Sequence, residues 1–226
     1  MKKILVIAAH PDDEIYGMGG TIAKLAAEGN EVHVLIVTDG STAQYRNCDD
    51  LSAILECKKR ETEKALSYVG VAACHYGELP DMRLDAVEHI KINEVIEKAI
   101  DEIAPDTVYT HFWGDVNMDH QKVFESTLVA TRPTSSQTVR ELYCYSVPSS
   151  TEWQPNLRVA FTPNVFVDIS AYTAQKAAAI EAYATELRQY PHPRSVEAVR
   201  MQDLASGLRM GLSAAEEFIL LRSIQE

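Results

Sequence analysis

Residues 8–20 read "AAHPDDEIYGMGG" and combine one histidine, three consecutive carboxylates and three glycines. They overlap the end of an apolar run, "ILVIAA", at residues 4–9. Continuous apolar runs of this length are typical of strands that are buried on both faces of a parallel sheet. The stretch therefore predicts a first strand that ends where the charged residues begin.

Strand-like and helix-like segments alternate along most of the chain. Amphipathic helical patterns cover Ile54–Val69 and Val87–Ile103, and two further helices are expected near 171–189 and after Ser195. The predicted strands are Ile4–Ala9, Val32–Thr38, Ala72–Tyr76, Thr107–Thr110, Leu142–Val147 and Val165–Ile169. This alternation predicts an α/β fold with a mostly parallel sheet, helices on both faces and a C-terminal helical layer.

Composition excludes several classes of protein. The chain has 226 residues, of which 46% are hydrophobic, so one sizeable core is expected, with residues 1–226 as a single domain. A formal net charge of -12 disfavours nucleic acid and anionic membrane surfaces as partners. Four cysteines without C-x-x-C spacing predict free thiols in a reducing cytoplasm; they are Cys48, Cys57, Cys74 and Cys144.

The carboxylate cluster Asp12–Glu14 lies where an open parallel sheet places its functional crevice, just past the carboxyl end of a strand. A bound cation or a helix N-terminus would offset the repulsion between its members. Two interpretations are open: a metal site, or turn formers and caps for a helix that begins near Gly17. A dinucleotide loop is excluded, because Ile22 stands where the third glycine of G-x-G-x-x-G would fall.

A second polar cluster follows a later predicted strand. Residues 110–123 read "THFWGDVNMDHQKV" and offer His111, Asp115, Asp119 and His120. Zinc prefers imidazole and carboxylate ligands, and catalytic zinc sites leave one coordination position open. The two clusters together therefore predict a zinc centre at the carboxyl edge of the sheet.

The motifs "AHPDDE" at 9–14 and "NMDHQ" at 117–121 resemble the PIG-L/LmbE-like family of zinc-dependent N-deacetylases, which hydrolyse N-acetyl groups on amino sugars and their conjugates. The resemblance covers nearly the whole chain. It includes "TDG" at 38–40, "KRETEKALSYVGV" at 59–71, "LPD" at 79–81, "PSST" at 148–151, "PHPRS" at 191–195 and "AEEF" at 215–218.

This resemblance implies a metal centre and a base. His10, Asp13 and His120 correspond to the metal ligands, for Zn²⁺ or another divalent transition metal. Asp12 corresponds to the general base that takes a proton from a water activated by zinc. Asp119 suits a residue that orients a histidine or the base, or the N-cap of a helix that begins at His120.

The second motif departs from the family pattern. Many members read His-x-Asp-His there, with the first histidine aiding the oxyanion or the leaving group, whereas this chain has Asn117. Asn117 still offers a neutral hydrogen bond. His111 and His192 are hypotheses for the cationic donor. Glu14 is assigned a structural role, bonding backbone amides or orienting His10.

The resemblance nominates three substrate contacts, Arg60, Asp81 and Arg194. Structural alternatives stay open: a solvated helix face for Arg60 and a salt bridge for Arg194. Trp113 and Trp153 either stack on a sugar ring or anchor their loops. Three further histidines fall within strand or helix patterns and receive no functional role; they are His33, His75 and His89.

The expected protein is a Rossmann-like α/β domain with one zinc ion that hydrolyses the N-acetyl group of an amino sugar, a glycoside or a nucleotide conjugate. The resemblance also implies a homo-oligomer, a trimer or a hexamer. Two alternatives are kept: an amidase acting on a non-sugar amide or thiol conjugate, and a non-catalytic protein that binds metal or sugar.

Overall fold

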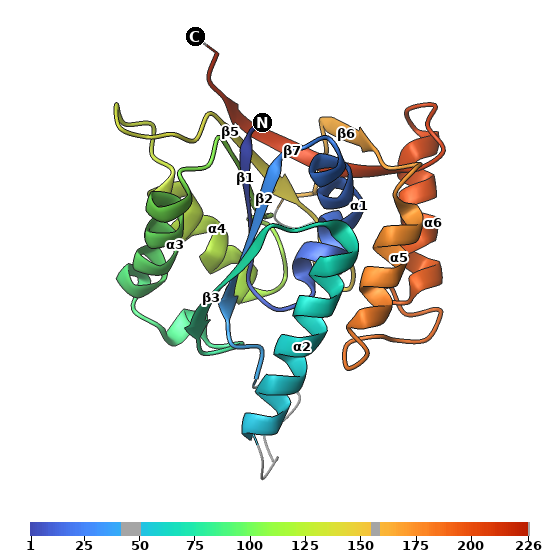
Figure 1. Cartoon of the computed structure of the whole chain (residues 1–226), viewed down its shortest axis with the longest axis horizontal. Helices are drawn as coiled ribbons and strands as arrows, with labels where there is room; N and C mark the ends of the chain where they lie inside the picture. Colours follow the sequence, from blue (N-terminus) through green and yellow to red (C-terminus); the bar gives the residue numbers. More distant parts are fainter. Residues whose placement is uncertain (42–50, 155–158, 226) are drawn as a thin grey trace.

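The computed structural model describes residues 1–41, 51–154 and 159–225, so the predicted thiol of Cys48 lies outside the described residues. Within them, a seven-stranded sheet has the order β3-β2-β1-β4-β5-β7-β6 (Figure 1). The strands are β1 (Lys3–Ala8), β2 (Glu31–Thr38), β3 (Ala73–Leu79), β4 (Thr107–His111), β5 (Glu141–Tyr145), β6 (Val165–Asp168) and β7 (Ala215–Ser223).

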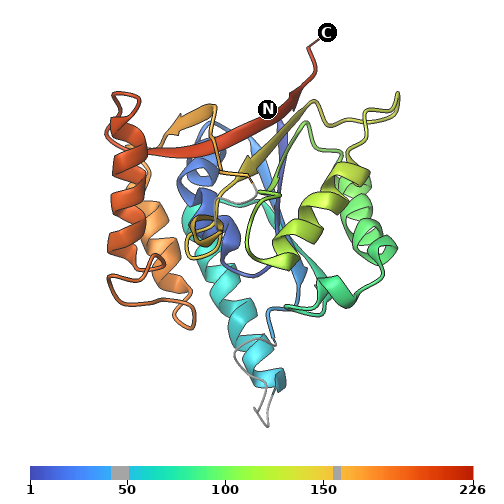
Figure 2. The same cartoon turned by 180° about the vertical axis from the view of Figure 1, so that it is seen from behind.

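Helices cover both faces of this sheet (Figures 1 and 2). They are α1 (Asp13–Ala27), α2 (Leu51–Val69), α3 (His89–Ile103), α4 (Met118–Ala130), α5 (Thr173–Ala182) and α6 (Val196–Leu208), with the short turns η1 (Leu84–Ala86) and η2 (Thr151–Trp153). One core joins the sheet to α1, α2 and α5, and a second joins it to α3 and α4. Among the helices described, none combines the length and apolarity needed to cross a bilayer.

The predicted α/β class is confirmed. Strands β1 to β5 run parallel to one another, and β1 lies between β2 and β4. Every predicted strand is present, with ends that coincide with the prediction or differ by up to three residues. The continuous apolar runs predicted these strands correctly because both faces of the sheet are covered.

The predicted C-terminal helical layer is confirmed, and one further strand follows it. Helices α5 and α6 are present, but the last element is β7, a strand that the sequence analysis missed. It runs antiparallel to both β5 and β6 and inserts between them. Its apolar run "FILL" at residues 218–221 is a local signal for this strand, whereas its antiparallel pairing between β5 and β6 is not visible in the alternation of strands and helices.

Among the helix ends that differ from the predictions, those of α1 and α5 shape the site. Helix α1 begins at Asp13 rather than near Gly17, because the Asp12 carbonyl already accepts hydrogen bonds from the amides of Ile15 and Tyr16. Helix α5 ends at Ala182 rather than near 189. The chain from 183 to 195 is therefore a loop.

Gly17 allows α1 to approach β5 closely. A Cβ atom at this position would overlap the ring of Tyr145 and lie 3.0 Å from the carbonyl oxygen of Ser146. The Tyr145 hydroxyl donates to the carbonyl of Ile7 at 2.8 Å, so this ring also ties β5 to β1. Gly17 thus leaves room for the Tyr145 ring, which connects the two strands beside the site.

We expect Gly17→Ala to lower the free energy of unfolding by about 1–3 kcal/mol, because the added methyl group has to displace a buried ring. Urea unfolding monitored by circular dichroism measures this change. Gly19→Ala in the same helix is the matched control, since its Cβ would come no closer than 3.3 Å to a neighbouring atom, at Ile15 Cγ2 and Lys176 Cγ. Equal losses in the two variants would contradict the argument.

Candidate metal centre and active site

In the turn after β1, the consecutive residues Asp12 and Asp13 have different surroundings. Asp12 adopts φ 112° and ψ -29°, a left-handed conformation that costs a non-glycine residue on the order of 1–3 kcal/mol. Its amide donates to Glu14 Oε2 at 3.1 Å. Asp12 lines a cavity, whereas the Asp13 carboxylate is fully buried beside two histidines.

Three ligand atoms form an almost equilateral triangle. Asp13 Oδ2 lies 3.1 Å from His10 Nδ1 and 3.2 Å from His120 Nε2, and the two nitrogens are 3.3 Å apart. Tetrahedral zinc bonds to nitrogen and oxygen at about 2.0–2.1 Å, which separates neighbouring ligand atoms by about 3.3 Å. Asp13 Oδ1 is also buried with no hydrogen-bond partner among the described residues. The three residues therefore fit one zinc-sized ion.

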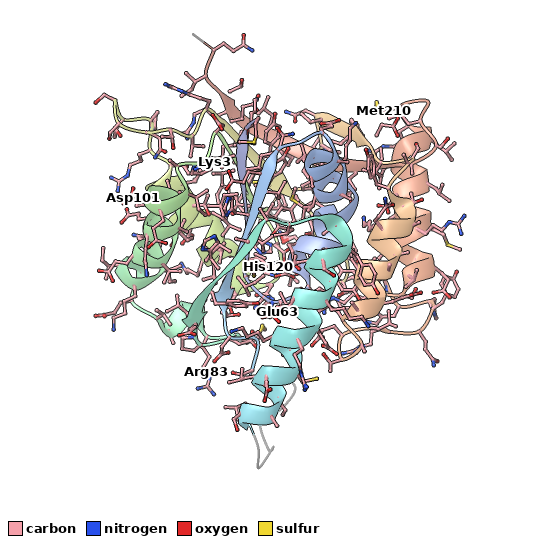
Figure 3. The ribbon with its side chains drawn as sticks, viewed as in Figure 1. Lys3, Glu63, Arg83, Asp101, His120 and Met210 are labelled. Atoms are coloured by element: carbon pink, nitrogen blue, oxygen red, sulfur yellow. The ribbon has the colours of Figure 1, made fainter. Side chains whose placement is uncertain are left out.

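A carboxylate contacts the ring nitrogen of His120 that lies outside the ligand triangle. His120 Nδ1 lies 3.2 Å from Asp115 Oδ2, and Figure 3 shows His120 in the interior of the molecule. The Asp115 carboxylate accepts hydrogen bonds from the Ser150 hydroxyl, the Thr151 hydroxyl at 2.7 Å and the Asn117 amide at 2.8 Å. A carboxylate on the far nitrogen of a metal-binding histidine fixes its tautomer and orientation.

His10 has a similar arrangement with two carboxylates. Its Nε2 lies 3.2 Å from both Asp119 Oδ2 and Asp81 Oδ1. Asp119 Oδ1 in turn accepts from the Leu84 amide at 3.0 Å. The alternative of Asp119 as an N-cap is wrong, because α4 begins at Met118 and its N-cap is Asn117, whose Oδ1 accepts from the Asp119 amide.

Glu14 lies next to the site but not in the ligand triangle. The Tyr183 hydroxyl donates to its Oε1 at 2.6 Å, and the Asp12 amide donates to its Oε2. Burial raises the pKa of Glu14 to about 8, although the Tyr183 hydrogen bond lowers it. The contacts of Glu14 match the structural role expected of it.

His111 is not a cationic donor, which corrects that hypothesis. It is fully buried, its Nε2 accepts from the Ala9 amide at 2.8 Å, and its ring stacks on His120 with centroids 3.9 Å apart. Burial and the neighbouring His120 hold the pKa of His111 well below its usual value. The neutral ring supports β1 and His120 instead.

The ligand triangle opens into a cavity of about 130 Å³ at the carboxyl ends of the strands. A larger cavity, of about 480 Å³, contains none of the triangle's ligands and lies between α1, α6 and β7. The cavity beside the triangle is lined by His10, Pro11, Asp12, Gly40, Lys58, Asp81, Met82, Asn117, Glu186 and Arg194. Charged groups dominate this lining, as polar ligands require.

Arg194 forms a bidentate ion pair with Asp12. The distances are 3.1 Å from NH1 to Asp12 Oδ2 and 3.2 Å from NH2 to Asp12 Oδ1. Burial raises the pKa of the Asp12 carboxyl to about 7, against the lowering effect of Arg194. A carboxyl group with a pKa near neutrality suits proton transfer in both directions.

Two polar residues of the cavity were missed by the sequence analysis, Lys58 and Glu186. The buried face of α2 repeats at helical spacing and includes Lys58 together with Thr62 and Ala65. A lysine on the buried face of an amphipathic helix is a signal that could have identified Lys58 as a candidate site residue. Arg60 is exposed and does not line the cavity, so its prediction as a substrate contact is not supported by its position.

The remaining candidates lie outside the cavity. His192 Nδ1 accepts a hydrogen bond from the Arg194 amide at 3.1 Å, and the side chain does not line the cavity. Its ring is 6.0 Å from that of Trp153, which is 56% exposed. Trp113 packs against Phe112 at 4.5 Å between ring centroids and anchors its loop.

Comparison with known proteins defines the class of this site. The family profile described as "PIG-L: GlcNAc-PI de-N-acetylase" matches residues 5–131, more than half of the chain, and the chain belongs to this family. It is 28% identical over 191 residues to "Uncharacterized deacetylase YaiS" of Escherichia coli (strain K12), covering 80% of this chain and 90% of that protein.

Two further proteins show the range of the likeness. The chain is 24% identical over 264 residues to "1D-myo-inositol 2-acetamido-2-deoxy-alpha-D-glucopyranoside deacetylase" of Mycobacteroides abscessus, covering 98% of this chain and 92% of that protein. The crystal structure of the hydratase GalB from Pseudomonas putida KT2440 matches with a TM-score of 0.80 at 19% identity, over 100% of this chain and 99% of that one. The second likeness shows the fold alone.

We expect Asp115→Asn to weaken zinc binding about 10- to 100-fold, because the amide no longer holds His120 electrostatically. Competition with a chromogenic chelator measures the affinity. Asp85→Asn, at an exposed position in η1, is the matched control. Unchanged affinity in Asp115→Asn would show that the contact does not support the metal site.

Proposed function

We propose that this protein is a zinc-dependent N-deacetylase that hydrolyses the N-acetyl group of an amino sugar or of its conjugate. The observation that supports it most is the triangle of His10, Asp13 and His120 beside a cavity that also holds the Asp12 carboxylate. The family match and the deacetylase names of its relatives agree with this activity.

The donor set supports zinc. Two imidazole nitrogens and one carboxylate oxygen, with a fourth position open, are the ligands of many catalytic zinc sites. When bound, zinc polarises a carbonyl group and lowers the pKa of water to about 7. His10, Asp13 and His120 would hold the ion, while Asp115 and Asp119 orient the two rings.

Asp12 carries the proton in the proposed reaction. Its carboxylate takes a proton from the attacking water as the new carbon–oxygen bond forms at the acyl carbon. It then gives that proton to the nitrogen as the carbon–nitrogen bond breaks, which yields acetate and a free amine. The pKa of about 7 permits both transfers.

The sugar would occupy the polar part of the cavity. Lys58, Asp81 and Glu186 offer charged hydrogen-bonding groups there, and sugar hydroxyls pair well with such groups. Asp81 Oδ1 lies 3.2 Å from His10 Nε2, so it connects this part of the cavity to the ligand triangle.

The proposed deacetylase and its two alternatives, an amidase and a binding protein, differ in the products that they release. An amidase for non-sugar amides would yield acetate or another acid only from those compounds, and a binding protein would yield none. The hydratase with the same fold shows that architecture does not decide the reaction. Acetate release from a panel of N-acetylated sugars and simple amides separates these possibilities.

Asp12→Asn should reduce acetate release by a factor of about 10² to 10⁴, since an amide cannot accept and return the proton. Zinc content, measured by elemental analysis, should stay at the wild-type level because Asp12 is not in the ligand triangle. Asp85→Asn controls for loss of a surface carboxylate. Full activity in Asp12→Asn would disprove the assignment of the base.

A homo-oligomer, a trimer or a hexamer, is proposed as the assembled form, in the cytoplasm. The described cysteines Cys57, Cys74 and Cys144 are free, which agrees with a reducing compartment. Apolar side chains on α6 recur at helical spacing and are exposed by 55%, 39% and 76%; they are Met201, Leu204 and Leu208. Such a stripe is typical of a surface covered by another protein.

Leu208→Glu should lower the particle mass measured by light scattering, because a charge would be buried in the contact between copies. Leu128→Glu, which places the same charge at a 40% exposed position on α4, should leave the mass unchanged. A monomeric wild type would contradict the proposed assembly.

A further inference from the structure

Amide hydrolysis builds negative charge on the acyl oxygen, and a fixed donor at that position accelerates the reaction. Asn117 is poorly placed to supply it. Its Oδ1 caps α4, and its Nδ2 lies 3.5 Å from Met82 Sδ. His111 is fully buried, its Nε2 accepts a hydrogen bond from the Ala9 amide, and it does not line the cavity. Among the described residues that line the cavity, the cationic side chains that remain are Lys58 and Arg194.

Arg194 is the cation beside the reacting groups. Its guanidinium contacts both oxygens of Asp12, and its NH2 lies 3.8 Å from Asp13 Oδ1, the oxygen that points away from the ligand triangle. It therefore borders both the general base and a metal ligand. Lys58 is paired instead with Glu186 at 2.5 Å.

The position of Arg194 is fixed from three directions. Its amide donates to His192 Nδ1 at 3.1 Å, and its carbonyl accepts from the Tyr16 hydroxyl at 3.1 Å. The ring of Tyr16 lies against the guanidinium, 5.0 Å from its central carbon to the ring centroid. A cation held in this way needs little reorganisation when charge develops next to it.

One donor of Arg194 has no acceptor. Its Nε is buried and has no hydrogen-bond partner among the described residues. Buried N–H groups are normally paired, and an unpaired one costs stability. Arg194 thus keeps a hydrogen-bond donor that no described residue uses, in a side chain that lines the polar cavity.

Glu186 keeps the guanidinium at this position. It is 5% exposed, its Oε1 accepts from Lys58, and its Oε2 lies 3.5 Å from Arg194 NH1. The charges alternate along Lys58, Glu186, Arg194 and Asp12. Because Glu186 and Asp12 attract Arg194 from two sides, the guanidinium stays at the cavity wall.

We propose that Arg194 is a catalytic residue that donates hydrogen bonds to the acyl oxygen as negative charge develops there, with Glu186 as its positioning residue. The inference rests on the deacetylase activity proposed above. Arginine keeps its proton at all working pH values, so it stabilises charge and transfers no proton. The proton transfers stay with Asp12.

The test compares turnover with binding. Removal of an oxyanion donor costs about 10²- to 10³-fold in kcat. Arg194→Met should therefore lose about 100-fold in kcat, with KM changed less than about threefold. Arg194→Lys should recover part of the loss. Arg188→Met is the matched control, because Arg188 lies in the same loop, 3.8 Å from Glu186, and does not line the cavity.

A second readout does not depend on turnover. A phosphonamidate analogue of the N-acetyl sugar carries a tetrahedral anion, and its affinity is measured by calorimetry. Arg194→Met should weaken its binding by the same factor as kcat, whereas the affinity for the N-acetyl sugar itself should change little. Glu186→Gln should weaken analogue binding by a smaller factor in the same direction.

Three results would overturn the inference. A rise in KM with unchanged kcat in Arg194→Met would make Arg194 a substrate contact only. A loss of kcat in Lys58→Met with none in Arg194→Met would assign the role to Lys58. A wild-type protein that releases no acetate from any N-acetylated sugar would remove the proposed function, and this inference with it.

Discussion

The candidate site is defined by the close approach of three ligand atoms at one edge of the sheet. Asp13 Oδ2, His10 Nδ1 and His120 Nε2 lie 3.1 to 3.3 Å from one another, although His120 is 110 residues away from His10 in the sequence. They meet because β1 and β4 are parallel neighbours whose carboxyl ends share one edge of the sheet. The buried core around β1 thus fixes the positions of these three side chains.

Burying so many carboxylates is costly, and the structure offsets this cost with specific partners. Burial raises the pKa of Asp13, but His120 and His10 outweigh it and hold that pKa well below its usual value. Asp12 is paired with Arg194, and Glu14 accepts from a tyrosine hydroxyl. One group is thus kept ionised for a metal, while its neighbour, with a pKa near 7, is suited to proton transfer.

Local patterns predicted the parts of the site that lie next to strand ends. Apolar runs and strand ends predicted two polar clusters at one edge of the sheet. The family resemblance then singled out His10, Asp13 and His120 within them. Lys58 and Glu186 depend on how α2 and the loop after α5 pack, and this packing is long-range information. Strand β7 was missed although its residues 218–221 read "FILL", a local apolar run; only its antiparallel position between β5 and β6 is long-range information.

The most direct test of the account is the coordination of zinc in the loaded protein, measured by an anomalous-scattering crystal structure or by X-ray absorption at the zinc edge. The account predicts one ion with two imidazole nitrogens and one carboxylate oxygen at about 2.0–2.2 Å, from His10, His120 and Asp13. An ion held by Asp81 and Asp119 instead, or one bound away from this edge of the sheet, would contradict it.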